Sequence, residues 1–120
     1  MKKTSDNFYD TPKWRRLRAS IMRRDKYLDQ EKKRTGTLKQ AEIVHHIWPR
    51  EKFPEYEYEA WNLIALAGST HNEMHDRTTD ELTEKGIALL IRTARKHNKP
   101  IPEEYLKPKK KKKNNTNWRR

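Results

Sequence analysis

The sequence predicts a small α+β domain in which two short strands and a short helix lie between an N-terminal and a C-terminal amphipathic helix. Apolar residues recur at helical spacing near both ends of the chain. Apolar and polar residues alternate over residues 40–47, and a second apolar run covers residues 61–66. With 120 residues, of which 32% are hydrophobic and 38% charged, the chain can form one domain with a small core.

The first helix is expected over residues 12–25. Thr11 can serve as its N-cap, and Pro12 occupies the first helical position, where the missing N–H of proline costs nothing. The residues at apolar helical spacing are Trp14, Leu17, Ile21 and Met22. The basic residues of the other face are Arg15, Arg16, Arg18, Arg23 and Arg24. We expect the apolar stripe to face the core, while the arginines either contact phosphates or remain solvated.

Loops, strands and further helices follow in order. Residues 26–38 are polar and are expected to form a loop. The strand over residues 40–47 is ended by Trp48-Pro49, and the second strand is expected over residues 61–66. Ser69 or Thr70 is expected to cap a short helix over residues 71–76, and a longer helix is expected over residues 83–97. Its expected buried residues are Ile87, Leu90 and Ile91.

The net charge of +12 is concentrated toward the C-terminus. Residues 108–120 contain five lysines and two arginines but no acid, and we expect a disordered basic tail there, following a domain that spans residues 1–107. A chain of this charge binds polyanions, and nucleic acid is the default polyanion of a cell. The tail residues Lys109, Lys110 and Lys111 are candidates for phosphate contacts, although a solubilising tail explains them equally well.

Composition also excludes several classes of protein. The absence of cysteine excludes disulfides and thiolate metal sites. No apolar run is long enough to span a bilayer, and Met1 leads into polar residues rather than a secretory signal. We therefore expect a cytoplasmic protein without a membrane partner.

Four of the five histidines fall between positions 45 and 75. His71 and His75 are four residues apart, so on a helix they share one face and provide half of a metal site. His45 and His46 are neighbours on an expected strand, so their side chains point to opposite faces. One imidazole can then bind a metal while another takes a proton from water, as metal-assisted hydrolysis requires. A group of ordinary surface histidines is the alternative.

Three segments together resemble the signature of the HNH endonucleases. They are VHHIWP at residues 44–49, WNLIAL at residues 61–66 and HNEMH at residues 71–75. The likeness extends over about residues 8–90 and is strongest to small phage-type proteins, which are often linked to genome packaging. It implies a ββα-metal finger, in which two short antiparallel strands and a helix surround one divalent ion.

The resemblance implies a role for each residue of the motif. His46 corresponds to the general base that activates water, and Asn62 to the residue that holds the loop between the strands and so positions His46. His45, His71 and His75 correspond to the metal ligands. Three neutral imidazoles suit Zn²⁺, Ni²⁺, Co²⁺ or Mn²⁺ better than Mg²⁺, which prefers oxygen ligands.

The implied activity is hydrolysis of DNA phosphodiester bonds to 5′-phosphate and 3′-hydroxyl ends. Arg50, Lys52 and Arg77 are candidates for phosphate contacts, and solvated side chains are an equal alternative. By family analogy, the partners besides DNA are phage packaging proteins (terminase or portal), in the cytoplasm of the host. The alternatives are a non-catalytic DNA-binding or packaging-accessory module that retains the fold, and a basic structural protein.

The chain departs from many HNH proteins at a second, structural zinc site, which those proteins build from two Cys-x-x-Cys pairs. The corresponding residues here are Asp29, Lys32, Ala67 and Thr70. Because all four cysteines are replaced together, we expect no structural zinc. Another interaction must then connect the loop over residues 26–38 to residues 67–70. The candidates are packing of Tyr27 or a salt bridge from Asp29 or Lys32.

Overall fold

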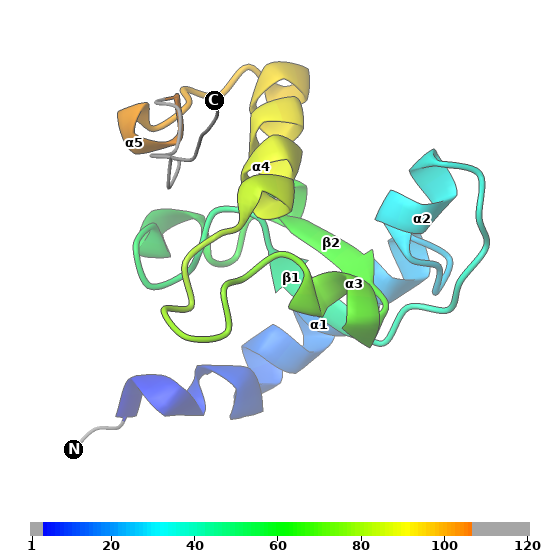
Figure 1. Cartoon of the computed structure of the whole chain (residues 1–120). Coiled ribbons are helices and arrows are strands. Elements are labelled where there is room, and N and C mark those ends of the chain that lie inside the picture. The colour runs from blue at the N-terminus through cyan, green and yellow to red at the C-terminus, as the bar shows by residue number, and fades with distance from the viewer. Residues whose placement is uncertain (1–3, 107–120) are drawn as a thin grey trace, which may run out of the picture.

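The computed structural model describes residues 4–106 and confirms the α+β fold class, with two antiparallel strands and flanking helices (Figure 1). The α-helices are α1 (Pro12–Arg24), α2 (Gln30–Arg34), α3 (Gly68–Asn72), α4 (Glu84–His97) and α5 (Glu103–Leu106). The strands are β1 (Ile43–His46) and β2 (Leu63–Leu66). Short 3₁₀ helices are η1 (Thr4–Asp10), η2 (Pro54–Tyr56) and η3 (Ala60–Asn62). Within the described range, every helix is too short or too polar to cross a lipid bilayer.

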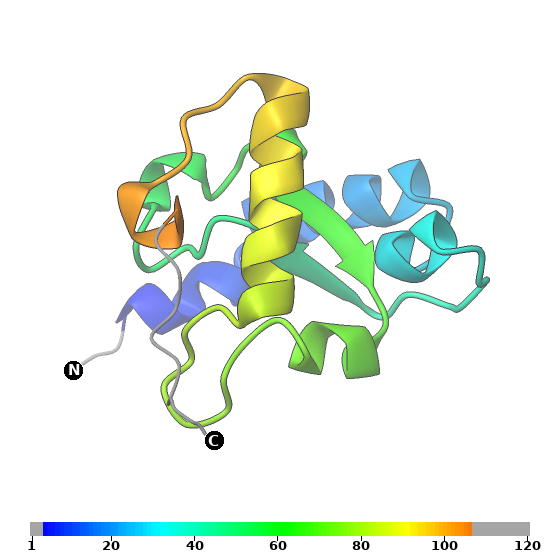
Figure 2. The same cartoon turned by 45° about the horizontal axis from the view of Figure 1, so that its top comes forward.

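The two strands separate two small apolar cores. In the antiparallel pair, Val44 lies opposite Ala65 and His46 lies opposite Leu63. Because side chains alternate between the faces of a strand, these four residues share the face that packs on α1. The other face, with Leu66, packs on α4, which crosses the sheet in Figure 2. The sheet therefore presents His46 and His45 to different surroundings.

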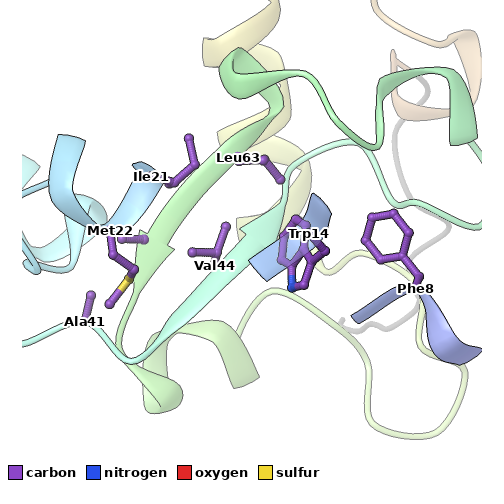
Figure 3. Close-up of a cluster of buried hydrophobic side chains, with 8 residues drawn as sticks. Phe8, Trp14, Ile21, Met22, Ala41, Val44 and Leu63 are labelled. Carbon is purple, nitrogen blue, oxygen red and sulfur yellow. The ribbon is translucent and has the colours of Figure 1, made fainter. Parts of the chain in front are cut away.

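The core beneath α1 contains the first tryptophan. Figure 3 shows Trp14 beside Phe8, and their ring centroids lie 5.2 Å apart. Ile21 and Met22 extend the same cluster toward Val44. The predicted apolar stripe of α1 is thus confirmed as a core-facing stripe. The rings of Phe8 and Tyr9, both from η1, pack against Trp14.

Each long helix begins after a threonine N-cap, of which Thr11 was predicted. Thr11 accepts the N–H of Trp14 at 3.2 Å, and Thr83 accepts the N–H of Gly86 at 3.2 Å. In α4 the buried set differs from the predicted one. Its buried apolar residues are Leu89, Leu90 and Ala94, and Ile87 and Ile91 are only partly buried. Leu89, Leu90 and Ala94 pack in the second core, and Ile87 lies at its edge.

The short elements correct four expectations. The segment predicted as a loop contains α2, whose N-cap is Asp29. α3 begins at Gly68 and ends at Asn72, so Ser69 and Thr70 lie inside it rather than capping it. Both strands are also shorter than predicted. β1 begins at Ile43 instead of residue 40, and β2 begins at Leu63 because η3 occupies residues 60–62. Residues 4–10, for which the sequence predicts no element, form η1.

Candidate functional site

Three histidines converge at the end of the sheet that faces α3. His45 comes from β1, His71 from α3 and His75 from the turn that follows α3. The ring centroids of each of the three pairs lie 5.2 Å apart. One ring nitrogen from each residue lies within 4.8 Å of the other two. Three imidazoles in a triangle of this size can bind a single ion.

The turn after α3, rather than the helix, places His75. Because α3 ends at Asn72, the spacing of four residues does not put His71 and His75 on one helix. His75 instead forms an isolated antiparallel bridge with Leu82. Its Nδ1 lies 3.4 Å from the carbonyl oxygen of Asp80 and 3.9 Å from the Asp80 carboxylate. Contacts of this kind orient an imidazole so that its other nitrogen faces a metal.

The chemistry of the three histidines fits a divalent transition metal. Burial lowers the pKa of His45 well below 6.5, and the neighbouring His71 and His75 lower it further. Burial, followed by His75, also lowers the pKa of His71. Among the described residues, Nε2 of His45 is one of two buried side-chain polar atoms without a hydrogen-bond partner. A buried, neutral, unpartnered imidazole nitrogen is a metal-ligand donor.

His46 lies on the opposite face of β1. Its ring stacks on Trp14, with the centroids 5.2 Å apart and the planes at 21°. Its Nε2 lies 3.0 Å from the carbonyl oxygen of Glu57, which as a pure acceptor requires Nε2 to carry the proton. Burial lowers the pKa of His46, while the hydrogen bond to Glu57 opposes this shift and Arg50 adds to it. The ring is thus neutral near pH 7, with Nδ1 as the proton acceptor.

Asn62 is fully buried and holds the segment between the strands. Its Oδ1 accepts the backbone N–H of Trp48 at 2.7 Å. Its Nδ2 donates to the carbonyl oxygens of Trp48 at 3.3 Å and Tyr56 at 3.2 Å. Tyr56 immediately precedes Glu57, whose carbonyl orients His46. Asn62 therefore lies at the base of the loop that fixes the imidazole.

We expect replacement of Asn62 by alanine to lower the free energy of unfolding by about 3 kcal/mol, because the change leaves buried backbone groups of Trp48 and Tyr56 without partners. Urea denaturation followed by circular dichroism measures this loss. The exposed Asn72 provides a matched control, since its alanine variant should change stability by no more than about 0.5 kcal/mol. Equal stability of the two variants would contradict the assigned role of Asn62.

The three clustered histidines and His46 open onto one cleft of about 660 Å³. The histidines that line it are His45, His46, His71 and His75. Its basic lining residues are Arg15, Arg18, Arg50 and Lys52. The cleft thus combines the candidate metal ligands and the candidate base with basic side chains that can bind phosphates. It is also lined by four acidic residues, Glu42, Glu51, Asp80 and Glu81.

Only some of the candidate DNA-contacting residues line the cleft. Arg50 and Lys52 line the cleft, each also in an ion pair of 3.3 Å, with Glu57 and Glu104 respectively. Arg77 is exposed in the turn after His75 and is not among the residues that line the cleft. The predicted tail contacts, Lys109, Lys110 and Lys111, lie outside the described residues.

Sequence reasoning did not single out Arg15, Arg18 and the exposed Tyr9 as part of the site. All three line the cleft, and Arg18 is held by a hydrogen bond of 2.8 Å to the carbonyl oxygen of Glu42. The basic face of α1 was the only signal for the arginines, and nothing in the local sequence distinguishes them from Arg16 or Arg23.

Three of the four positions that carry zinc-binding cysteines in many HNH proteins are connected here by hydrogen bonds. The carboxylate of Asp29 accepts the N–H of Lys32 and the N–H of Ala67, both at 2.7 Å. Asp29 is thus the connecting residue, through backbone N–H groups rather than a salt bridge. The proposed packing of Tyr27 is wrong, because 52% of that residue is exposed.

The structure is similar to the crystal structure of the HNH endonuclease of the deep-sea thermophilic bacteriophage GVE2, which contains a manganese ion. The TM-score is 0.55 and the sequence identity 29%, over 57% of this chain and 74% of that chain. No protein-family model and no curated protein matches the sequence. The two-stranded antiparallel sheet with its helices agrees with this likeness, which confirms the resemblance of the chain to the phage HNH endonucleases.

Proposed function

We propose that this chain is a metal-dependent DNA endonuclease that hydrolyses phosphodiester bonds to 5′-phosphate and 3′-hydroxyl ends. The observation that carries the proposal is the single cleft onto which the cluster of His45, His71 and His75 opens together with His46. The likeness to an endonuclease that binds manganese supports the same activity and a divalent ion.

The three clustered histidines would hold the ion. Their donor set of neutral imidazole nitrogens suits Mn²⁺, Ni²⁺, Co²⁺ or Zn²⁺ better than Mg²⁺. When bound, the ion would stabilise the negative charge that develops on the phosphate and on the leaving group. Burial of His45 keeps its ring neutral, so proton competition for this ligand is weak at pH 7.

His46 would act as the general base. The carbonyl oxygen of Glu57 holds its Nε2–H, so Nδ1 is the atom that takes a proton from the attacking water. The stacked ring of Trp14 limits rotation of the imidazole. Asn62, which touches neither water nor DNA in this scheme, would keep the Glu57 carbonyl in place through Tyr56.

Basic side chains around the cleft would hold the DNA backbone. Arg15 and Arg18 project from α1, and Arg50 and Lys52 follow β1. Phosphates would compete with Glu57 for Arg50 and with Glu104 for Lys52. Because contacts between basic side chains and phosphates release counterions from DNA, binding should weaken with salt. Arg77, outside the cleft, would add a phosphate contact, and so would the lysines Lys109, Lys110 and Lys111. By family analogy alone, we propose phage packaging proteins as partners and the host cytoplasm as the location.

The test is cleavage of supercoiled plasmid by metal-stripped protein to which Mn²⁺, Ni²⁺, Co²⁺, Zn²⁺ or Mg²⁺ is added separately. We expect nicked or linear products with the transition metals and none in the presence of EDTA. The products should be joined by DNA ligase without prior phosphorylation, since the ends carry 5′-phosphate and 3′-hydroxyl groups. Protein that shifts the plasmid on a gel but does not cut it in the presence of any of the five ions would instead be a non-catalytic DNA-binding module.

A further inference from the structure

Side chains, rather than a third strand, cover the outer edge of β2. β2 pairs with β1 along its other edge. On the outer edge Arg24 Nη2 donates to the carbonyl oxygen of Leu63 at 2.7 Å, and Asp25 Oδ2 accepts the N–H of Ala65 at 3.0 Å. The next backbone N–H on this edge is that of Ala67, and the carboxylate of Asp29 accepts it. The segment from the end of α1 to the start of α2 therefore satisfies an edge that would otherwise be unpaired.

Asp29 is the most buried member of this series, with 0% of its surface exposed. Its Oδ1 accepts the N–H of Lys32 in the first turn of α2, and its Oδ2 accepts the N–H of Ala67. An ionised carboxylate only accepts hydrogen bonds, so two backbone N–H donors match its two oxygens. One side chain thus joins segments 38 residues apart in the chain.

Ala67 connects this carboxylate to the candidate metal site. It is the residue immediately before α3, and its carbonyl oxygen accepts the N–H of His71 at 2.9 Å. A path of two hydrogen bonds and one residue therefore runs from Asp29 to His71. The next amide, that of Gly68, donates to the Glu42 carboxylate at 2.9 Å, so the start of α3 is held from two sides.

We propose that Asp29 is a positioning residue for the metal site. By fixing the start of α3 against β2, it places the imidazole of His71 opposite His45 and His75. α3 has five residues and no side-chain cap of its own, so its orientation depends on such contacts. The inference rests on the proposed metal-binding role of the three histidines, but it concerns metal affinity and not cleavage.

The first test compares Zn²⁺ binding by wild type and by Asp29→Asn, using isothermal titration calorimetry on metal-stripped protein. Asparagine keeps the size of the side chain but turns one acceptor into an NH₂ group, which must face one of the two N–H donors. We expect Zn²⁺ affinity to fall by about 10-fold, as when an outer contact of a metal ligand is lost. Amide hydrogen exchange at Ala67 and His71, measured by NMR, should become faster.

Glu31→Gln is the matched control. Glu31 lies on the same short helix and pairs with Arg92 of α4 at 2.6 Å, so the change removes a charged contact of α2 that does not involve α3. Its Zn²⁺ affinity should equal that of the wild type. If Asp29→Asn binds Zn²⁺ as tightly as the wild type, even with a lower melting temperature, Asp29 only supports the fold and the proposal is overturned.

A second measurement uses the unmodified protein and does not depend on the folding of a variant. Coupling between sites is reciprocal, so Zn²⁺ should slow amide exchange at Ala67 and Lys32. Unchanged exchange at both amides in Zn²⁺-saturated protein would overturn the positioning role while leaving the proposed nuclease standing. Wild type that binds no Zn²⁺, Mn²⁺ or Ni²⁺ would overturn both.

Discussion

Replacement of His46 by alanine should reduce plasmid cleavage by about 100-fold or more while leaving DNA and metal binding intact. The reason is geometric. His46 lies on the α1 face of β1 with Trp14, whereas the three clustered histidines occupy the other side of the strand pair. The variant therefore removes the proton acceptor without removing a metal ligand. Single-turnover cleavage, gel shift and metal titration measure the three properties separately.

The pH dependence of the wild type provides a second check on His46. A general base must be neutral, and burial lowers the pKa of His46 below its ordinary value of 6.5. The pKa of His45 and His71 is lowered in the same direction, so the metal ligands also stay neutral. Cleavage should therefore hold its plateau at pH 7 and decline only below pH 6.5.

Two variants control for the fold. His97→Ala removes an exposed histidine at the end of α4 and should cleave like the wild type. His46→Gln retains a group that can donate to the Glu57 carbonyl but cannot accept a proton as imidazole does. It should be folded and as inactive as His46→Ala. Wild-type rates in both His46 variants would assign the base to another residue.

Replacement of His71 by alanine should weaken metal binding by more than about 100-fold, because loss of a ligand exceeds the effect of losing an outer contact. Cleavage should be lost at metal concentrations that saturate the wild type. His71 suits this test better than His45, because it is only partly buried, while His45 is 1% exposed and its removal would leave a cavity.

Isothermal titration calorimetry with Mn²⁺ and plasmid cleavage over a range of Mn²⁺ concentrations measure the two effects. Asn72→Ala changes the next residue, which is exposed, and should bind Mn²⁺ like the wild type. Undiminished Mn²⁺ affinity in His71→Ala would show that the cluster is not the metal site, whatever the variant does to cleavage.

The long elements could be predicted from the sequence because their signals are local. Thr11 and Thr83 each accept an N–H three residues later, as expected for N-caps. The alternation around Val44 similarly identified the strand and placed His45 and His46 on opposite faces. Caps and alternation depend on neighbours a few residues away, so they appear in the sequence itself.

The bounds of α3 could not be predicted in this way, because distant residues hold its start. The N-terminal amides at α3 are bound by Asp29 and Glu42, which lie 38 and 26 residues away. The spacing of four residues correctly paired His71 with His75, but the expected reason, a shared helix face, was wrong. α3 ends at Asn72, and the following turn places His75 beside His71.

By itself the sequence determined which residue types are available for chemistry: four histidines near two strands, no cysteine and a surplus of positive charge. Only the tertiary structure decided which of them meet. It brought one ring nitrogen each of His45, His71 and His75 within 4.8 Å of one another. It also set His46 against the carbonyl oxygen of Glu57 and placed Arg15 and Arg18 beside the same cleft. The physical reason is that α1, α3 and the strands are joined by long-range packing and by buried carboxylates such as Asp29. Such contacts have no local pattern in a single sequence.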